Sequence, residues 1–188
     1  MQIRTDLRLI LESLNREQLP HMVVGALAVD AWGVPRTTMD IDIQVALPGP
    51  PDKLRSVYLG LVVEEWSRDK TFDQDVVIGS VGSPIPVEIF VTTHWFTSQA
   101  LSRRVELPSA LVGRAVPVPT REDLILLKAA YQAAPWRSRR KAAQDGVDIE
   151  HLLTFAPSLD LDYLQINGQR LGVWEFISET LKESRPTS

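Results

Sequence analysis

Hydrophobic and polar positions along the first part of the chain predict helices interleaved with strands. Four apolar side chains recur at helical spacing within residues 5–18: Leu7, Ile10, Leu11 and Leu14. We therefore expect an amphipathic helix there. The apolar run 21–24 predicts a short buried strand that ends at Gly25, and the small apolar residues 26–32 favour a short helix. The clearest strand pattern covers residues 39–46.

The rest of the chain is divided by the same criteria. The expected elements are a Pro/Gly loop over 48–51, a helix over 52–66, strands over 74–80 and 85–92, extended structure over 102–118, and helices over 137–154 and 170–183. Thr120 with Glu122 and Asp123 predicts a capped start of a further helix. This order indicates an α/β (α+β) fold, with a core over 1–118 and a C-terminal helical part over 119–188 that packs on it.

Composition narrows the class of protein. The chain has 188 residues, of which 44% are hydrophobic and 23% charged, so we expect one globular domain or a domain with an appendage. It has no cysteine, which excludes disulfides, thiolate zinc sites and cysteine nucleophiles and suits a reducing cytoplasm. The charged N-terminal stretch does not resemble a signal peptide, and no apolar run is long enough to span a membrane. The formal net charge of −4 predicts no overall attraction to nucleic acid.

The segment MDIDIQV carries the most informative polar residues. On a strand, Asp40, Asp42 and Gln44 lie on one face and the intervening apolar residues on the other. Two adjacent carboxylates repel each other, and a divalent cation such as Mg²⁺ would compensate for that repulsion. The alternative is an amphipathic strand with a solvated polar face.

Residues around this strand offer phosphate-binding groups. The turn at Gly25 leads into a helix and can present backbone N–H groups to phosphate. Arg36, Thr37 and Thr38 directly precede the acidic strand and offer a guanidinium and two hydroxyls. A simple turn glycine and a surface arginine are the alternatives.

Glu88 is a third candidate carboxylate, because it interrupts the apolar run PVEIFV. A charged residue at a strand centre is unusual unless it is paired, solvated or bound to metal. Two metals held by three carboxylates can activate a hydroxyl and stabilise a leaving pyrophosphate. The alternative is an edge strand on which Glu88 faces water.

Together these residues resemble a known signature. Gly25-Ala26 with Ala28, then Gly33, Arg36, Thr38 and Asp40-Ile41-Asp42 resemble the nucleotidyltransferase (DNA polymerase β-like) superfamily, in particular its minimal stand-alone bacterial branch with AbiEii-type toxin-like proteins. The resemblance implies a mixed sheet flanked by helices. Ala26 departs from the pattern, in which glycine or serine is usual at this position.

The resemblance continues downstream. Glu88 occupies the place of the third carboxylate, and the segment PTREDLILLK resembles the helix with a nucleotide-proximal lysine, here Lys128. The segment 145–152 resembles a further helix of the family, with Gln144 in place of the usual lysine. Lys128 has an alternative role as a surface lysine whose stem covers apolar residues. The basic segment 136–141 offers RNA phosphate contacts, with a solvated loop and helix start as the alternative.

We therefore expect a cytoplasmic nucleotidyltransferase that uses Mg²⁺, with Mn²⁺ as a substitute, and ATP or another nucleoside triphosphate. The predicted metal and catalytic residues are Asp40, Asp42 and Glu88, and the predicted nucleotide-binding residues are Gly25, Ala26, Arg36, Thr38 and Lys128. The expected acceptor is a hydroxyl of a tRNA-like RNA or of a protein, and the resemblance implies a toxin-antitoxin context with an antitoxin partner. The alternative is a catalytically degenerate member that acts as a binding or antitoxin-like module.

Overall fold

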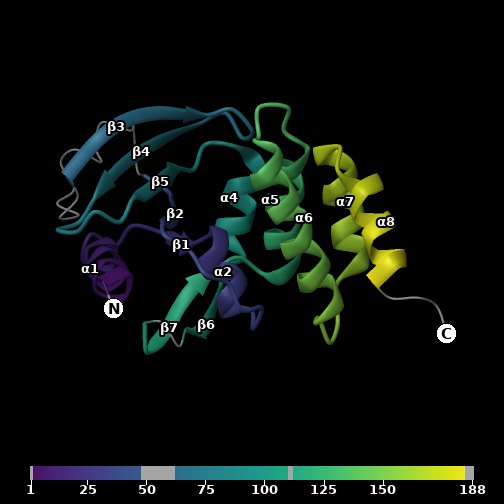
Figure 1. Cartoon of the computed structure of the whole chain (residues 1–188), viewed down its shortest axis with the longest axis horizontal. Coiled ribbons are helices and arrows are strands. Elements are labelled where there is room, and N and C mark those ends of the chain that lie inside the picture. The colour runs from purple at the N-terminus through teal and green to yellow at the C-terminus, as the bar shows by residue number, and fades with distance from the viewer. Residues whose placement is uncertain (1, 48–61, 110–111, 185–188) are drawn as a thin grey trace.

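The computed structural model describes residues 2–47, 62–109 and 112–184. The described strands are β1 His21–Val23, β2 Ile41–Val45, β3 Val62–Asp69, β4 Gln74–Ser80, β5 Val87–Val91, β6 Val105–Ser109 and β7 Arg114–Val118. The described helices are α1 Gln2–Arg16, α2 Gly25–Ala31, α4 Trp95–Ser102, α5 Arg121–Ala133, α6 Arg139–Thr154, α7 Leu161–Leu171 and α8 Trp174–Ser184. Helices α5 to α8 gather on one flank of the sheet, as Figure 1 shows. The predicted α/β (α+β) fold is confirmed.

The main sheet has five strands in the order β1-β2-β5-β4-β3, and β6 and β7 form a separate antiparallel pair. Only β2 and β5 run parallel within the described sheet, and their register places Asp42 opposite Glu88. Side chains that are opposite each other on neighbouring strands point to the same face. The sheet therefore brings together two carboxylates that are far apart in sequence.

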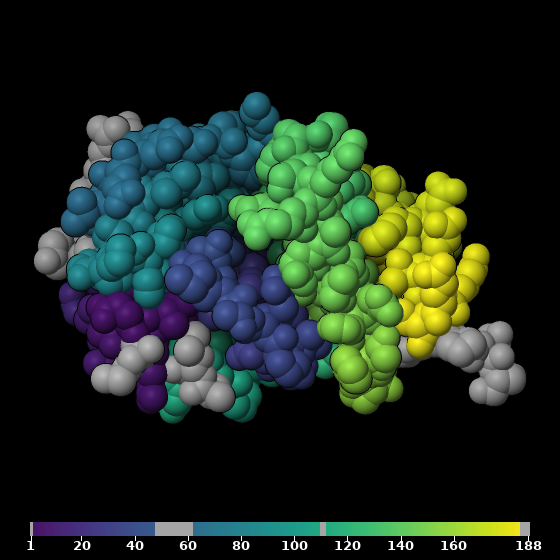
Figure 2. All heavy atoms as spheres, in the orientation of Figure 1, coloured from purple at the N-terminus to yellow at the C-terminus, as the bar shows by residue number. Residues whose placement is uncertain are grey.

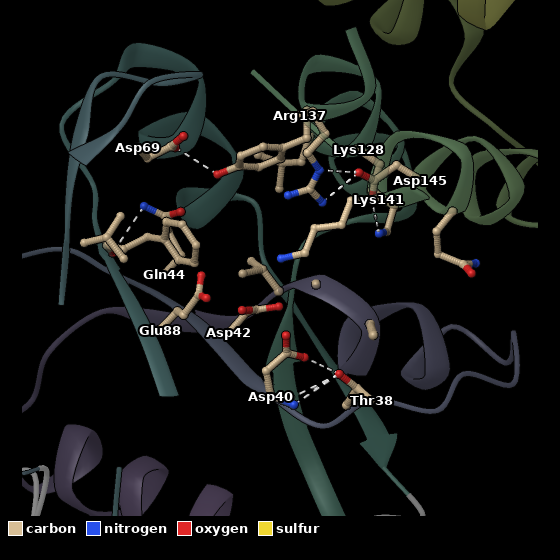
Figure 3. Close-up of a pocket in the computed structure, with 18 of the residues that line it drawn as sticks. Thr38, Asp40, Asp42, Gln44, Asp69, Glu88, Lys128, Arg137, Lys141 and Asp145 are labelled. Carbon is tan, nitrogen blue, oxygen red and sulfur yellow. Dashed lines mark hydrogen bonds and ion pairs between the residues drawn. The ribbon is translucent and has the colours of Figure 1, made fainter. Parts of the chain in front are cut away.

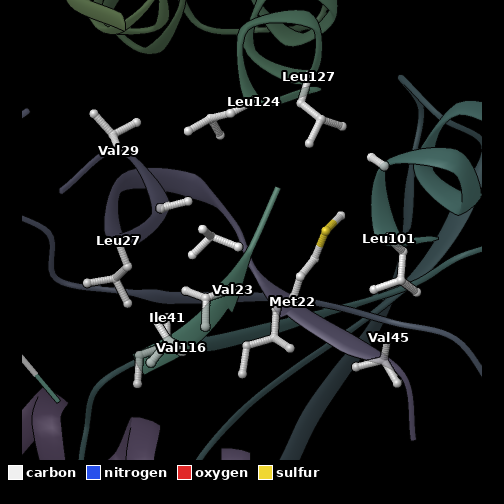
Figure 4. Close-up of a cluster of buried hydrophobic side chains, with 14 of the residues drawn as sticks. Met22, Val23, Leu27, Val29, Ile41, Val45, Leu101, Val116, Leu124 and Leu127 are labelled. Atoms are coloured by element: carbon white, nitrogen blue, oxygen red, sulfur yellow. The ribbon is translucent and has the colours of Figure 1, made fainter. Parts of the chain in front are cut away.

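The hydrophobic core lies between the sheet and the helices. Strand β2 buries Ile41, Ile43 and Val45, as its alternating pattern predicts. Figure 4 shows Leu124 and Leu127 of α5 near Met22 and Val23 of β1 within this cluster. The predicted apolar face of α1 is also buried: Leu7, Ile10, Leu11 and Leu14. The apolar side of β2 thus fixes the strand, which leaves Asp42 on the opposite face.

Several boundaries differ from the sequence prediction. Residues 62–66, expected at the end of a helix, begin strand β3, while the loop 48–51 and residues 52–61 of that helix lie outside the described residues. The predicted helix over 170–183 is in fact the end of α7 and most of α8, separated by Gly172 in the left-handed conformation. Helix α4 and most of α7 were not predicted. No helix in the described ranges is long and apolar enough to cross a membrane.

Candidate functional site

A pocket of about 550 Å³ opens between the sheet, α5 and the start of α6. All eight predicted site residues line it: Gly25, Ala26, Arg36, Thr38, Asp40, Asp42, Glu88 and Lys128. Figure 3 shows Asp40, Asp42 and Glu88 on one side of this pocket, and Arg137, Lys128 and Lys141 with Asp145 on the other. In Figure 2, the blue atoms of the α2 and β2 region lie between the teal strands and the green helices α5 and α6. The structure therefore gathers the candidate residues at one place.

Asp42 and Glu88 form the acidic centre of the pocket. Among the described residues, neither carboxylate accepts a hydrogen bond or forms an ion pair. Burial, followed by the charges of Asp40 and Glu88, raises the pKa of Asp42 from its usual 3.8 to about 7. Burial also raises the pKa of Glu88, and the negative charge of Asp40 adds to this shift. Two unpartnered, partly desolvated carboxylates on adjacent strands are the kind of group that a bound cation stabilises.

Gly25 is the first residue of α2 and lies against the carboxylate of Asp42. Its φ of +63° lies in the left-handed region, and a Cβ built there would overlap the carboxylate of Asp42. The two segments are joined by a backbone hydrogen bond of 2.9 Å from Val24 N–H to the carbonyl of Asp42. Only glycine meets both requirements, the positive φ and the close approach.

Asp40 lies one residue before β2, in a bend rather than in the strand. Its carboxylate accepts a hydrogen bond from the Thr38 hydroxyl. Within the described part of the chain, no three His, Asp or Glu side chains converge closely enough to form a ready-made metal site. The three-carboxylate site inferred from sequence is therefore not preassembled and stays a prediction. Mg²⁺ proteins commonly supply one or two carboxylates and leave the remaining positions to water and substrate phosphates.

Lys128 lies in the wall of the pocket, but two aspartates of α6 engage its ammonium group. Its Nζ lies 3.0 Å from Asp145 Oδ1 and 2.7 Å from Asp148 Oδ2. Only 7% of the residue is exposed and its ammonium is paired, so the alternative of a surface lysine whose stem covers apolar residues is wrong. Arg36 pairs with the same Asp148 at 2.9 Å, and this contact ties the loop before β2 to α6.

Most of the basic segment 136–141 lines the same pocket. Trp136, Arg137, Arg140 and Lys141 all line it. Arg137 donates to Asp145 through Nε at 3.0 Å and Nη2 at 2.7 Å. Lys141 extends toward Asp42 and Glu88 (Figure 3), and its charge opposes the rise in the pKa of both. The sequence singled out these basic residues for RNA contacts and did not connect them with the acidic strand.

A polar network behind the carboxylates was not predicted. Asp69 at the end of β3 accepts hydrogen bonds from Tyr131 at 2.8 Å and from Gln74 at 3.0 Å. Gln74 in turn accepts from Gln44 at 2.8 Å. Burial and then the charge of Asp69 raise the pKa of Tyr131 well above its usual value. In the sequence, the only signal for this network was the alternation that places Asp42 and Gln44 on the same face of β2. The side chains that complete the network come from other strands and from α5.

Structure comparison identifies similar folds at low sequence identity. The solution structure of the antibiotic-resistance factor ANT(2'')-Ia has a TM-score of 0.60 and 18% identity, over 95% of this chain and 97% of that chain. The crystal structure of ANT(2'')-Ia in complex with adenylyl-2''-tobramycin has a TM-score of 0.57 and 15% identity, over 98% and 100%. The chain has a nucleotidyltransferase-like fold.

A third structure agrees with this fold. An antigenic nucleotidyltransferase-like protein from Paracoccidioides brasiliensis has a TM-score of 0.51 and 17% identity, over 94% of this chain and 91% of that chain. No protein-family model matches the sequence, and no curated protein matches it. The nucleotidyltransferase-like architecture expected from the resemblance is therefore confirmed, while the AbiEii-type branch stays a prediction.

Proposed function

We propose that the protein is a metal-dependent nucleotidyltransferase, which transfers a nucleoside monophosphate from a nucleoside triphosphate to an acceptor hydroxyl. The observation that carries the proposal is the pairing of Asp42 with Glu88 on parallel strands, with both carboxylates unpartnered among the described residues and facing a pocket. Basic side chains line the opposite wall of that pocket. An acidic centre that faces cationic groups suits a magnesium-bound polyphosphate.

The donor chemistry of the site fits Mg²⁺ or Mn²⁺. Asp42 and Glu88 offer hard carboxylate oxygens, and Asp40 lines the same pocket from the bend before β2. Asp40 and Asp42 would hold the metal, and Glu88 would complete a second metal position. When bound, such a cation neutralises charge on the transferring phosphoryl group and on the leaving pyrophosphate.

The chain's own residues would bind the nucleotide and take the proton. Gly25, Ala26, Arg36 and Thr38 line the pocket around the acidic strand, where they would contact the triphosphate. The acceptor oxygen bonds to the α-phosphorus as the bond between that phosphorus and the β-phosphate oxygen breaks, which releases pyrophosphate. Glu88 would accept the hydroxyl proton, a role open to a carboxylate that lines the pocket and has no hydrogen-bond partner among the described residues.

The acceptor would approach from the β3–β4 side of the pocket. Ser67, Val76 and Ile78 line that side. Arg68 also lines it, but this arginine pairs with Asp73 and Asp75, so that side has no unpaired basic side chain among the described residues. We keep RNA and protein hydroxyls as candidate acceptors. An aminoglycoside hydroxyl is a third candidate, because the similar ANT(2'')-Ia structure contains adenylyl-2''-tobramycin.

Incubation with α-labelled nucleoside triphosphates and Mg²⁺ tests this function. Parallel reactions would contain total cell RNA, total cell protein or tobramycin, and the Glu88→Gln variant would serve as the matched control. We expect label transfer in one of the three wild-type reactions and a large loss in E88Q with nucleotide binding retained. Nucleotide binding without transfer to any acceptor would favour the non-catalytic binding module instead.

A further inference from the structure

Five charged side chains form one continuous row of ion pairs along the wall of the pocket. In order, the row contains Arg36, Asp148, Lys128, Asp145 and Arg137. Signs alternate from one member to the next, with distances of 2.9, 2.7, 3.0 and 2.7 Å. The row joins the loop before β2 to α5, α6 and the α5–α6 connection.

The centre of the row is buried and its ends are not. Asp148 is fully buried, Asp145 is 3% exposed and Lys128 is 7% exposed. The two arginines at the ends are more accessible, with 23% of the Arg36 side chain and 21% of the Arg137 side chain exposed. A buried charge left without a partner is strongly destabilising, so the three central groups hold each other in place.

The charges in the row do not cancel. Three cations face two carboxylates, which leaves a net charge of +1 at a pocket wall. Arg140 and Lys141 line the same pocket and form no side-chain ion pair among the described residues. This wall therefore favours an anionic ligand, and the groups free to meet it are the arginine ends of the row, Arg140 and Lys141, rather than Lys128.

We propose that Lys128 is a positioning residue that does not itself contact the triphosphate. It holds Asp145 and Asp148, which in turn aim Arg137 and Arg36 at the phosphates, and Lys141 supplies the lysine that contacts them. This inference rests on the proposed nucleotide-binding function and differs from the sequence expectation, in which Lys128 binds the nucleotide directly.

Two geometric facts favour this assignment. The Lys128 ammonium lies between two carboxylates at 3.0 and 2.7 Å, which engage two of its three N–H donors and offset its charge. Lys141, on the first turn of α6, is exposed and extends toward Asp42 and Glu88, where the phosphates of a metal-bound nucleotide would lie (Figure 3).

Lysine labelling of the wild-type protein tests the assignment without any substitution. An amine-acylating reagent is applied with and without Mg²⁺ and the α,β-methylene analogue of ATP, GTP, CTP or UTP that binds most tightly, and labelled peptides are quantified by mass spectrometry. We expect Lys141 to be labelled in the free protein and protected by the analogue, and Lys128 to stay unlabelled in both. Lys182, exposed on α8, is the control and is labelled equally throughout. Labelling of Lys128 that the analogue suppresses overturns the inference.

A substitution at Asp145 separates the two roles of Lys128 by the sign of its effect. If Lys128 binds phosphate directly, Asp145→Leu frees its ammonium and removes a negative charge near a polyanion, so the analogue binds more tightly. If Asp145 positions Arg137, the same change weakens binding by about tenfold, the size expected for the loss of a charge-assisted hydrogen bond. Glu150→Gln, an exposed position on the same helix, is the matched control and changes affinity less than twofold.

A double-mutant cycle completes the test. Arg137→Gln should weaken binding of the analogue about as much as D145L does. The double variant D145L/R137Q should bind the analogue no more weakly than R137Q alone, because both substitutions remove the same contribution of Arg137. Unchanged or tighter binding by D145L, or additive losses in the double variant, overturns the inference. Failure of the wild type to bind any of the four analogues would refute the proposed function itself, and would be seen before any variant is compared.

Discussion

Gly25 and Asp42 approach so closely that no side chain fits between them. A Cβ at position 25 would overlap the Asp42 carboxylate, and the φ of +63° at Gly25 independently disfavours other residues. The first residue of α2 and the acidic residue of β2 are therefore one structural unit. Any change at position 25 acts on the carboxylate that we assign to the metal.

Gly25→Ala should consequently affect both stability and the site. The left-handed conformation alone costs an alanine about 1–2 kcal/mol, and the overlap with Asp42 adds to that cost. We expect a lower melting temperature and no stabilisation by Mg²⁺ with a nucleotide analogue, because Asp42 must move. Thermal unfolding with and without both ligands measures the two effects.

Gly82→Ala is the matched control for this variant. Gly82 also has a positive φ, of +66°, but a Cβ there would meet no atom within 4 Å. G82A should therefore be destabilised only by the cost of the left-handed conformation, and its melting temperature should still rise with Mg²⁺ and the nucleotide analogue. Equal destabilisation and equal ligand response in G25A and G82A would contradict the close coupling of Gly25 to Asp42.

Asp42 predicts a specific pH dependence of the metal-free protein. Its pKa is raised from 3.8 to about 7, so its favourable contribution to folding is complete below pH 3.8 and is lost as the pH rises through 7. Asp42→Asn removes this loss. The variant should melt at the same temperature as the wild type near pH 4 and several degrees higher at pH 8.5, measured in EDTA.

Asp73→Asn provides the contrasting case. The hydrogen bond and charge of Arg68 lower the pKa of Asp73, which is an exposed carboxylate. Exposed ion pairs contribute little to stability, so D73N should change the melting temperature only slightly at any pH. A constant difference between D42N and the wild type from pH 4 to 8.5 would show that Asp42 does not titrate as described.

Ala26 allows a gain-of-function prediction. The residue lines the pocket beside Gly25, at the position where the related sequence pattern has glycine or serine. Ala26→Ser adds a hydroxyl that can donate to a phosphate, which should tighten binding of the nucleotide analogue about two- to tenfold. Titration calorimetry measures this change. The bulkier Ala26→Val is the control and should weaken binding.

The sequence was sufficient for the elements that have clear periodicity. The alternation in β2 correctly placed Ile41 and Ile43 in the core and Asp42 toward the pocket, because one strand with one apolar face has only one way to pack. The pairing of Asp42 with Glu88 was not derivable in the same way. It depends on β5 lying parallel beside β2, which is a property of the whole sheet.

Long-range partners explain the remaining differences. Lys128 follows an apolar helical run, but nothing local indicates that Asp145 and Asp148 come from the next helix to pair with it. Helix α7 contains Gly168, which weakens a helical pattern. The structure uses that glycine for close contact with Trp174, 3.3 Å from where a Cβ would lie. In both cases tertiary packing overrides the local signal.

The most direct test of the account measures ligand-induced stabilisation in wild type and D42N side by side. With Mg²⁺ and the α,β-methylene nucleotide analogue at about 100 times its Kd, mass action should stabilise the wild type by about 2.7 kcal/mol, a rise of about 5–10 °C in Tm. EDTA should remove most of that rise in Tm. The Tm of D42N should not rise with the analogue, whether Mg²⁺ or EDTA is present. Equal shifts in both proteins, or a wild-type shift that EDTA does not reduce, would contradict the metal-dependent nucleotide site at Asp42 and Glu88.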